Sequence, residues 1–438
     1  MIQKLKNIFI HLPKSIFYNF YYGFPSKKLT LIGVTGTDGK TTTCTLIHEI
    51  LKQSGLKTGL ITTIGAKVED REIDTGFHTT TPDPSLLQKI LAEMVKAGMT
   101  HVVCEVTSHA LDQYRFLGCQ FEISGITNTS HEHLDYHKNL TNYINTKAKL
   151  FSISKSAVLN KDDQSFEIIK KQIKTPFKTF SIKENSDYQA KKIKLDQNLL
   201  NFEVNDQKFT TDSNYEYQIY NILLALAICQ KLKIDLSLVQ KTIEHFPETK
   251  GRREEIPNDF KFKTIIDFAH TPFALEASLS SLRKIDKGNL IVIFGATGGR
   301  DQSKRPEMGK VVSKQANIAF ITADDTRNEK IEDINKQIIS GIDPKKSELI
   351  DYQEIKNKKQ IQNIIELSKQ KFIYFNIPNR QDAFNLAIKF AQPQDIVIAC
   401  GKGHETTILH GRTEYPWSEA EAFRTAFRLK KLNKNGSI

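Results

Sequence analysis

The chain has 438 residues, of which 26% are charged and 39% hydrophobic, and its net charge is +12. This length predicts two or three domains, and the composition is that of a soluble protein with no membrane-spanning helix and no nucleic-acid-binding motif, whose charge suits anionic ligands such as nucleotides. The five cysteines are scattered without a Cys-x-x-Cys pair, which argues against a disulfide framework or a zinc ribbon and predicts a cytoplasmic location.

The first 28 residues form a basic, aromatic segment. Pro13, Lys14 and the lack of a small-residue cleavage site argue against a signal peptide. Two interpretations remain open: a helix packed on the next domain, which we favour, or an amphipathic segment that makes a peripheral contact with an anionic membrane. The segment has five lysines, no acidic residue, and the aromatic residues Phe9, Phe17, Tyr18, Phe20, Tyr21, Tyr22 and Phe24.

An apolar, β-rich run then enters a glycine-rich turn that opens a helical pattern. A strand, a flexible turn and a helix N-terminus form a phosphate cradle, in which Lys40 can reach the terminal phosphates and Thr41 can hold Mg²⁺. Val34 stands where the strict phosphate-loop pattern has glycine, but the flanking strand and helix still favour a phosphate loop over an ordinary turn with a surface lysine. The turn consists of Gly36, Thr37, Asp38, Gly39, Lys40, Thr41 and Thr42.

Strand and helix patterns alternate from residue 29 to residue 160. This alternation predicts a doubly wound sheet with ligands at the carboxyl ends of its strands. A helix is expected at Pro84–Ala97, with Asp83 as its cap. Residues 176–211 are β-rich and irregular, and Pro247–Gly251 marks a domain boundary. The other expected strands are Lys57–Thr63, His101–Val106, Glu122–Thr127 and Ala157–Asn160, and the other helices are Tyr217–Gln230 and Leu236–Glu244.

A second alternating region predicts a Rossmann-like domain that ends in a basic helix and tail. The fold class is therefore α/β: a basic aromatic segment (1–28), a P-loop-type doubly wound central ATP-binding domain (29–248) and a Rossmann-like C-terminal domain (249–438). The strands expected in the last domain are Lys263–Phe268, Asn289–Gly295, Ala316–Thr322, Lys371–Phe375 and Asp395–Cys400.

Polar side chains follow several strands of the central domain. Glu105 ends a strand beside the phosphate loop, where a carboxylate would hold Mg²⁺. His131-Glu132-His133-Leu134-Asp135-Tyr136-His137 is rich in metal ligands, but its spacing does not favour zinc, and a role near phosphate and Mg²⁺ is preferred. An amphipathic helix carries Lys147 and Lys149, and the residues alone give no reason to choose between them.

The C-terminal domain has similar clusters. Arg252 could stabilise the charge of a transferring phosphoryl group, and Asp267 could accept a hydrogen bond from a ribose. Gly295–Asp301 follows a strand like a second anion-binding loop, although this signal is weak by itself. Together with Asp324–Arg327 and Gly401–Glu405, these clusters predict a ligand pocket at the strand ends.

Seven motifs make the set specific: Thr-Gly-Thr-Asp-Gly-Lys-Thr-Thr, Glu-Val-Thr-Ser-His-Ala-Leu-Asp-Gln-Tyr-Arg, His-Leu-Asp-Tyr-His, Gly-Arg, Asp-Phe-Ala-His-Thr-Pro, Arg-Asp-Gln-Ser-Lys-Arg-Pro and Gly-Lys-Gly-His-Glu. From about Leu29 to near Phe423, the chain resembles the ATP-dependent Mur ligases of peptidoglycan synthesis. The resemblance is strongest to the MurE-type branch, which adds the third residue to UDP-N-acetylmuramoyl-L-alanyl-D-glutamate.

The resemblance implies roles for individual residues. Gly36 to Thr42 would cradle ATP with Lys40 on the phosphates, and Asn221, Arg252 and Asp267 match nucleotide-contacting positions. Lys147 matches the family's lysine that CO₂ carbamylates, which turns a cation into an anionic Mg²⁺ ligand. The catalytic set would be Lys40, Glu105, His133 and Lys147, the metal set Thr41, Glu105, His133 and Lys147, and the muramoyl-dipeptide set Thr80, Thr81, Thr107, Gln113 and Arg115, with Thr107 in place of the usual Ser.

The incoming amino acid is a finer question. Family members that use meso-diaminopimelate carry Asp-Asn-Pro-Arg, where this chain has Asp324-Asp325-Thr326-Arg327. A fixed guanidinium favours a carboxylate over a lysine ammonium, and Arg300, Gly401 and Glu405 also match diaminopimelate-contacting positions. These residues favour diaminopimelate. Because Asp325 adds negative charge beside the pocket, lysine stays open as the alternative.

The front of the chain departs from the family. Full members have a UDP-binding domain of roughly a hundred residues before the phosphate loop, and here about 30 residues precede it. The comparison with the family therefore predicts that the uridine-binding half is absent. Either the acceptor is not a UDP-sugar, or a partner protein supplies that surface.

The resemblance implies ATP-dependent amide bond formation through an acyl phosphate, with a muramoyl-peptide acceptor, diaminopimelate or lysine, and no nucleic acid. Two alternatives stay open. One is another amide ligase of the superfamily, such as a folylpolyglutamate synthase-like enzyme. The other is a non-catalytic nucleotide-binding subunit, against which the retained Lys40, Glu105, His133 and Lys147 argue.

Overall fold

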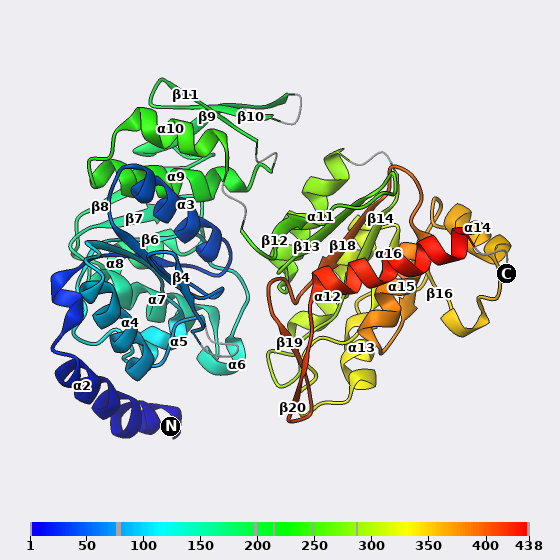
Figure 1. The fold of residues 1–438 in the computed structure, drawn as a ribbon, viewed down its shortest axis with the longest axis horizontal. Coiled ribbons are helices and arrows are strands. Elements are labelled where there is room, and N and C mark those ends of the chain that lie inside the picture. Colours follow the sequence, from blue (N-terminus) through cyan, green and yellow to red (C-terminus); the bar gives the residue numbers. More distant parts are fainter. Residues whose placement is uncertain are drawn as a thin grey trace. The chain divides into compact units, whose positions relative to one another are not determined.

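The computed structural model describes residues 2–75, 80–196, 199–212, 215–246, 249–285 and 288–435. The chain divides into two compact units (Figure 1). The first unit comprises Met1–Ser130 and His137–Pro247, and the second comprises His131–Tyr136 and Glu248–Ile438. In the described ranges, no helix combines the length and apolar character that crossing a bilayer requires.

The first unit is built on a mixed sheet whose centre is parallel. The strand order is β11-β10-β9-β8-β7-β6-β1-β5-β2-β3-β4, and β1 pairs in parallel with both β5 and β6. The strand β1 therefore lies between β5 and β6, and the strand order reverses at the centre, as it does in a doubly wound fold. The strands are β1 (Thr30–Thr35), β2 (Thr58–Ile61), β3 (Ala66–Val68), β4 (Arg71–Ile73), β5 (His101–Glu105), β6 (Phe121–Ile126), β7 (Ala157–Asn160), β8 (Phe177–Ser181), β9 (Tyr188–Asp196), β10 (Leu199–Val204) and β11 (Gln207–Thr211).

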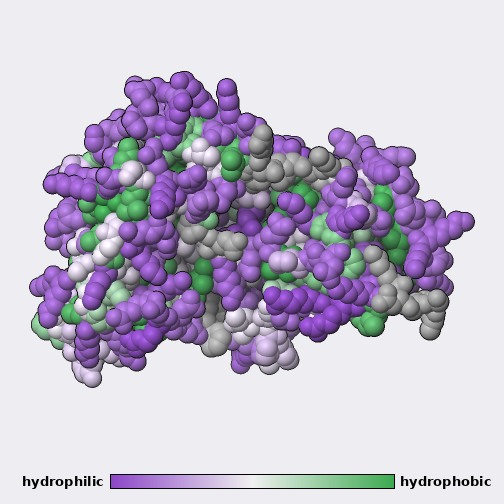
Figure 2. All heavy atoms as spheres, turned by 45° about the horizontal axis from the view of Figure 1, so that its top comes forward, coloured by the Kyte–Doolittle hydropathy of each residue, from purple (hydrophilic) through white to green (hydrophobic). Residues whose placement is uncertain are grey.

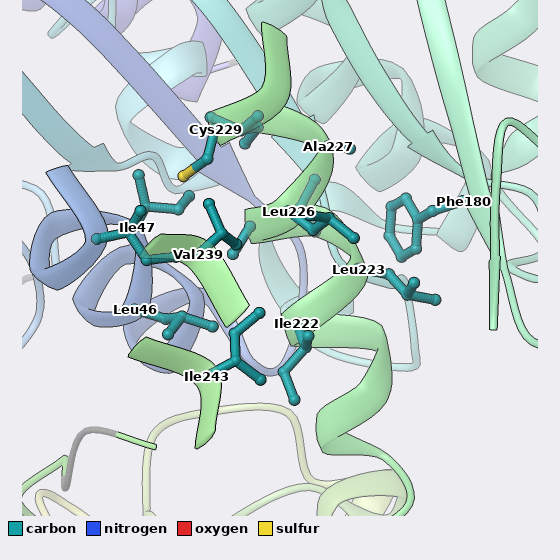
Figure 3. Close-up of a cluster of buried hydrophobic side chains, with 14 of the residues drawn as sticks. Leu46, Ile47, Phe180, Ile222, Leu223, Leu226, Ala227, Cys229, Val239 and Ile243 are labelled. Carbon is teal, nitrogen blue, oxygen red and sulfur yellow. The ribbon is translucent and has the colours of Figure 1, made fainter. Parts of the chain in front are cut away.

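Helices cover both faces of this sheet because its central strands are apolar on both sides. In β1, Ile32 and Val34 belong to the core under α3 (Lys40–Gln53), α9 (Gln218–Lys231) and α10 (Leu236–Glu244), where the side chains drawn in Figure 3 interdigitate. Leu31 belongs to a separate core, under α4 (Pro84–Lys96) and α5 (Ser108–Asp112). A third cluster lies under α7 (Leu140–Ser152) and α8 (Phe166–Gln172).

The N-terminal segment is helical and lies against the first unit. It consists of α1 (Ile2–Lys6), a π-helical turn (Asn7–His11), α2 (Leu12–Tyr21) and a 3-10 turn (Pro25–Lys28). The side-chain amide of Asn19 in α2 donates to the carbonyl of Leu117, at 2.8 Å. The helix expected from the sequence is therefore present.

The second unit has a seven-stranded sheet of order β12-β13-β18-β14-β15-β17-β16, parallel except for β12. Its strands are β12 (Arg252–Glu255), β13 (Lys263–Asp267), β14 (Leu290–Phe294), β15 (Ile318–Ile321), β16 (Ser347–Leu349), β17 (Phe372–Asn376) and β18 (Ile396–Cys400), with a separate hairpin of β19 (Thr407–His410) and β20 (Thr413–Pro416). Its helices are α11 (Pro272–Ile285), α12 (Lys304–Gln315), α13 (Ile331–Ile339), α14 (Lys358–Leu367), α15 (Arg380–Phe390) and α16 (Glu419–Asn435), and a 3-10 turn spans Tyr352–Glu354.

The predicted fold class is confirmed, and the strands and helices expected from the sequence form with small shifts at their ends. The Asp83 side chain caps α4 by accepting from the backbone N–H of Ser85, at 2.8 Å. The hairpins β3–β4 and β19–β20 and the short strand β16 were not expected, because runs of three or four residues carry too little periodicity. On the face drawn in Figure 2, hydrophilic residues dominate and apolar residues lie in small groups.

Candidate functional site

The glycine-rich turn after β1 lies where the carboxyl ends of β6, β1, β5 and β2 meet. Gly36 has φ +145°, and a Cβ atom there would lie 1.8 Å from Thr127 Oγ1. Gly39 has φ +81°, and a Cβ atom there would lie 2.3 Å from Asn221 Oδ1. Only glycine fits either position, because the backbone conformation is left-handed and the neighbouring side chains leave no room for a Cβ atom.

The loop that follows β6 holds the turn in place. The backbone N–H of Thr37 donates to the Asn128 carbonyl at 2.8 Å, and that of Asp38 donates to Asn128 Oδ1 at 3.0 Å. Thr127 Oγ1 donates to the Asp38 carbonyl at 2.6 Å. Helix α3 then begins at Lys40, so its first-turn N–H groups and its dipole favour an anion at this end.

Glu105, at the end of β5, is buried opposite the start of α3. Its Oε2 accepts hydrogen bonds from Thr41 Oγ1 at 2.8 Å and from both the backbone N–H and the hydroxyl of Thr63 at 3.0 Å. Lys40 Nζ lies 3.8 Å from Glu105 Oε1 and donates to the Thr37 carbonyl at 2.8 Å. The structure thus brings Lys40, Thr41 and Glu105 together, as expected. No role was predicted for Thr63, although it follows β2 and polar residues at the ends of parallel strands meet at one edge of the sheet, as argued for Glu105.

The structure distinguishes Lys147 from Lys149. Lys147 is buried, its Nζ donates to the Gly36 carbonyl at 2.6 Å and lies 4.4 Å from the centre of the Tyr143 ring. Burial, followed by the positive charge of Lys40, lowers the pKa of Lys147 well below its usual range. Lys149 is half-exposed and pairs with Asp112 at 3.0 Å. Lys147 therefore lies at the phosphate loop, while Lys149 belongs to the outer surface of α7.

The expected muramoyl-dipeptide residues form one cluster next to Glu105. Thr81 Oγ1 donates to the Glu105 carbonyl at 3.0 Å and lies 3.3 Å from Thr107 Oγ1, which caps α5. Arg115 Nη2 donates to Gln113 Oε1 at 2.8 Å, and its Nη1 donates to the Thr81 carbonyl. Contacts through Thr81 and Arg115 thus link four of the five predicted residues, and the half-buried Thr80 precedes Thr81 in the chain.

The histidine-rich segment groups mainly with the second unit. Within it, His131 Nε2 lies 3.1 Å from Asp301 Oδ2, and Lys304 Nζ lies 3.3 Å from both carboxylate oxygens of Glu132. His133 has φ +55°, and its Nδ1 lies 3.8 Å from Glu132 Oε1. Because Thr41, Glu105 and Lys147 belong to the first unit, a metal site that adds His133 to them stays a prediction.

The residues expected to contact a nucleotide are Asn221, in the first unit, and Arg252 and Asp267, in the second. Asn221 is buried beside Gly39 and accepts a hydrogen bond from Thr43 Oγ1 at 3.2 Å. The Arg252 guanidinium lies 4.2 Å from the centre of the Phe268 ring. Asp267 Oδ2 accepts from Ser278 Oγ at 2.6 Å and lies 3.6 Å from Arg253 Nε. Arg253, which stands directly after Arg252, had no role predicted for it.

Asp325, which is expected to add negative charge beside the pocket, forms an ion pair with a buried lysine. Its Oδ1 accepts from the buried Lys402 Nζ at 2.8 Å and from the backbone N–H of Leu409 at 2.9 Å. Although burial opposes it, the carboxylates of Asp324, Glu405 and Asp325 raise the pKa of Lys402. Lys402 also pairs with Glu405. It belongs to the Gly-Lys-Gly-His-Glu motif, but no role was predicted for it.

Two guanidinium groups lie near this ion pair. Burial, followed by the positive charge of Arg327, lowers the pKa of Arg300, so the two cations are close. Arg327 has φ +50°, and its Nε is buried without a hydrogen-bond partner among the described residues. Gly401 has φ +111° and passes so close to Asp324 that a Cβ atom would lie 2.7 Å from Oδ2. The predicted diaminopimelate residues therefore gather at the ends of β14, β15 and β18.

An ion pair between the buried Arg305 and the partly exposed Glu329 anchors the loop that carries Arg300. Arg305, at the start of α12, is fully buried, and its guanidinium donates to both carboxylate oxygens of Glu329, at 2.7 and 2.9 Å. It also donates to the Thr297 carbonyl at 3.0 Å, and Glu329 accepts from the backbone N–H of Gly299. Glu329 was missed because nothing in the sequence pairs it with Arg305.

Two family models match the chain, one for each alternating region. The model described as the Mur ligase middle domain matches residues 34–229. The model described as the Mur ligase glutamate ligase domain matches residues 251–403.

Curated relatives match most of the chain. The UDP-N-acetylmuramoyl-L-alanyl-D-glutamate--2,6-diaminopimelate ligase of Caldanaerobacter subterraneus subsp. tengcongensis is 35% identical over 406 residues, which cover 92% of this chain and 78% of that protein. The protein of the same name from Aquifex aeolicus is 35% identical over 413 residues, with the same coverage.

Solved structures agree on the fold. A structure of a UDP-N-acetylmuramoyl-L-alanyl-D-glutamate--2,6-diaminopimelate ligase has a TM-score of 0.61 and 26% identity, and the match covers 95% of this chain and 83% of that one. The folylpolyglutamate synthase of Mycobacterium tuberculosis has a TM-score of 0.70 at 14% identity, with 95% coverage of both chains.

The Arg305–Glu329 pair generates a prediction about acid stability. Hydrogen bonds from Arg305 hold the pKa of Glu329 at about 2, below its ordinary value, so the ionised carboxylate stabilises the fold above the ordinary pKa and this contribution is lost as the pH falls towards 2. We expect Glu329→Gln to lower the free energy of unfolding by roughly 1–3 kcal/mol at pH 7 and by less at pH 3.5, as measured by urea unfolding followed by circular dichroism.

The matched control is Glu366→Gln. Glu366 forms an exposed pair with Lys369, and its loss should change the free energy of unfolding by less than about 0.5 kcal/mol at either pH. An equal loss for Glu329→Gln at both pH values would contradict the assigned role of the carboxylate.

Proposed function

The chain belongs to the Mur ligase family, and we propose that it uses ATP to join an amino acid to the carboxylate of a muramoyl-peptide acceptor in peptidoglycan synthesis. The observation that carries this proposal is the contact of Lys40 and Thr41, at the start of α3, with the buried carboxylate of Glu105. The names of relatives about 35% identical over 92% of the chain support the same reaction.

The proposed reaction has two steps. An oxygen of the acceptor carboxylate attacks the γ-phosphorus of ATP, which yields an acyl phosphate and ADP. The amine of the incoming amino acid then attacks the acyl carbon, an amide bond forms, and phosphate leaves with the loss of the amine proton. Lys40 and the first-turn N–H groups of α3 would stabilise the negative charge on the transferred phosphoryl group.

Mg²⁺, when bound, neutralises charge that develops on the phosphates. The first unit offers the hard oxygen ligands that Mg²⁺ prefers, since the Thr41 hydroxyl and the Glu105 carboxylate lie 2.8 Å apart beside the phosphate loop. We assign these two residues to the metal, and the family resemblance adds His133 and a carbamylated Lys147.

The environment of Lys147 supports carbamylation. CO₂ reacts with a neutral amine, and burial favours the neutral form of Lys147 by lowering its pKa. The amine nitrogen bonds to the carbon of CO₂ and releases a proton, which leaves an anionic carbamate. This change would replace a buried amine 2.6 Å from the Gly36 carbonyl with an anionic group whose oxygens suit Mg²⁺.

The substrates of the reaction are assigned to separate clusters of residues. We assign the acceptor to Thr80, Thr81, Thr107, Gln113 and Arg115, because the Thr81 hydroxyl contacts the Glu105 carbonyl and Arg115 contacts the Thr81 carbonyl. The adenosine would contact Asn221, Arg252 and Asp267. We assign the amino acid to the pocket of Arg300 and Arg327, with Asp324, Asp325, Gly401 and Glu405 around it.

The pocket favours diaminopimelate over lysine. Arg300 and Arg327 are two cations, and the nearby Asp325 forms an ion pair with Lys402. Arg327 Nε also lacks a partner among the described residues. A carboxylate of the amino acid would supply that partner, whereas the ammonium group of lysine would be repelled.

The test of ligase activity is ADP release. We expect release only when a muramoyl-peptide acceptor and an amino acid are both present, across a screen of UDP-linked, lipid-linked and free muramoyl peptides. Lys40→Ala should lower the rate by roughly a hundredfold or more, because it removes a charge from the phosphate loop. Lys52→Ala, on the exposed side of the same helix, should leave the rate unchanged.

Two other outcomes would replace the proposal. ADP release that occurs only with a folate-type acceptor together with glutamate would indicate a folylpolyglutamate synthase-like enzyme. Nucleotide binding without ADP release for any pair of substrates would indicate a non-catalytic subunit.

Carbamylation is tested with Lys147→Ala. We expect the rate of ADP release to fall by roughly a hundredfold or more, with partial rescue by a small carboxylic acid that replaces the missing anion. In the unaltered protein, ¹³C-labelled bicarbonate should give a carbamate carbon signal in an NMR spectrum. That signal should be absent from Lys147→Ala and retained in Lys149→Ala, and full activity of Lys147→Ala would refute the role.

The choice of amino acid is tested with Arg327→Ala. We expect the KM for diaminopimelate to rise by roughly tenfold to a hundredfold with a much smaller change in kcat, because one charged hydrogen bond to the substrate is lost. Arg424→Ala, which removes a surface guanidinium from α16, should leave KM unchanged. Lysine turned over as well as diaminopimelate by the unaltered protein would contradict the assignment.

A further inference from the structure

The N-terminal helical segment (residues 2–21) has its polar side chains buried and its apolar side chains exposed. Asn7, Ser15 and Asn19 are buried. Asn7 Nδ2 donates to Asp112 Oδ2 at 2.7 Å, and Asn19 Nδ2 donates to the carbonyls of Leu117 and Ser15 at 2.8 Å. Ordinary surface helices of globular proteins have the opposite arrangement. The side of the segment that faces the first unit is thus fixed by specific hydrogen bonds.

The opposite side exposes large apolar side chains. Half of the sixteen exposed large hydrophobic side chains found in the described part of the chain belong to this segment. Within α2, the spacings of one, four and five residues place the exposed side chains on one face. The eight are Leu5, Ile8, Phe9, Ile10, Ile16, Phe17, Phe20 and Tyr21, with exposed fractions from 43% to 73%. Such a concentration of apolar surface indicates an interaction site.

The charged side chains that the segment itself carries have a single sign. Residues 1–37 contain five lysines and no aspartate or glutamate. Lys6, Lys27 and Lys28 are exposed, and the described residues offer none of them an ion pair. Lys14 lies 3.6 Å from Asp83. An apolar face with aromatic rings, flanked by unpaired lysines, complements an anionic bilayer, where the rings enter the headgroup region and the ammonium groups contact the lipid phosphates.

We propose that residues 2–28 are a membrane-docking element that places the first unit on the surface of a bilayer containing anionic lipid. The apolar face of α1, the π-helical turn and α2 enters the interface, while the buried polar face keeps the element attached to the protein. The element lies in the plane of the membrane and does not span it, in agreement with the absence of a spanning helix from the described residues. This proposal does not depend on the proposed ligase activity.

A second copy of the chain is the other occupant that an exposed apolar face suggests. The charges disfavour it, because a self-complementary contact would bring the lysines of two copies together without an acidic residue on either side of the segment. An anionic surface has no such repulsion.

The experiment is flotation of the full chain with two kinds of vesicle. We expect the protein to float with vesicles of phosphatidylcholine and phosphatidylglycerol, and to bind pure phosphatidylcholine roughly tenfold or more weakly. Added salt should release it. Phe17→Ser with Phe20→Ser should lower the bound fraction by roughly tenfold or more, because two rings leave the interface, and Lys27→Gln with Lys28→Gln should lower it roughly tenfold.

Matched variants separate these effects from general changes in apolar surface and charge. Leu432→Ser removes an equally exposed apolar side chain from α16, and Lys345→Gln with Lys346→Gln removes the same charge from the second unit. Both should bind vesicles like the unaltered chain. Because Phe17 and Phe20 are exposed, their double variant should keep the circular dichroism spectrum and melting temperature of the parent.

Three results would overturn the proposal. One is the absence of binding to anionic vesicles, and another is equal binding by the Phe17→Ser, Phe20→Ser variant. The third is a dimer, detected by light scattering, that is lost in the same double variant while the unaltered chain binds no vesicles. That result would assign the face to a second copy of the chain. None of these measurements uses ligase activity, so failure here is distinguishable from failure of the proposed reaction.

Discussion

The site in the first unit depends on a backbone turn that approaches its neighbours too closely for any side chain. At Gly36 and Gly39 a Cβ atom would lie 1.8 and 2.3 Å from Thr127 and Asn221. The turn is therefore held between the loop after β6 and helix α9. This constraint sets where α3 begins, and hence where Lys40 and Thr41 meet the carboxylate of Glu105. The lysine beneath the turn, Lys147, is fixed by the same geometry through the carbonyl of Gly36.

Much of this arrangement could be predicted from local patterns. The phosphate loop and Glu105 were found because both follow apolar strands, and parallel strands end at one edge of a sheet. The choice between Lys147 and Lys149 could not be made in that way, since both lie on one amphipathic helix and only burial against the turn separates them. Thr63 obeyed the rule used for Glu105 and was overlooked.

In the second unit, the contacts that could not be predicted are ion pairs of buried cations. Arg305 with Glu329, Lys402 with Asp325 and Arg380 with Glu419 join positions 24, 77 and 39 residues apart. A charge is buried only when a partner compensates for its lost hydration, but a sequence does not state which partner that is. The pairing of Asp325 with Lys402 was not foreseen for this reason. These pairs hold the loops of Arg300, Arg327 and Glu405 at the strand ends.

The order of strands around β1 has a consequence for biosynthesis. Thr41 bonds to a residue 64 positions later, and Asp38 to one 90 positions later. Contacts of such long sequence separation form slowly, because the closure of long loops costs entropy before any contact is gained. During synthesis, the contacts that hold the glycine turn therefore form only after Asn128 has left the ribosome and β6 has joined the sheet.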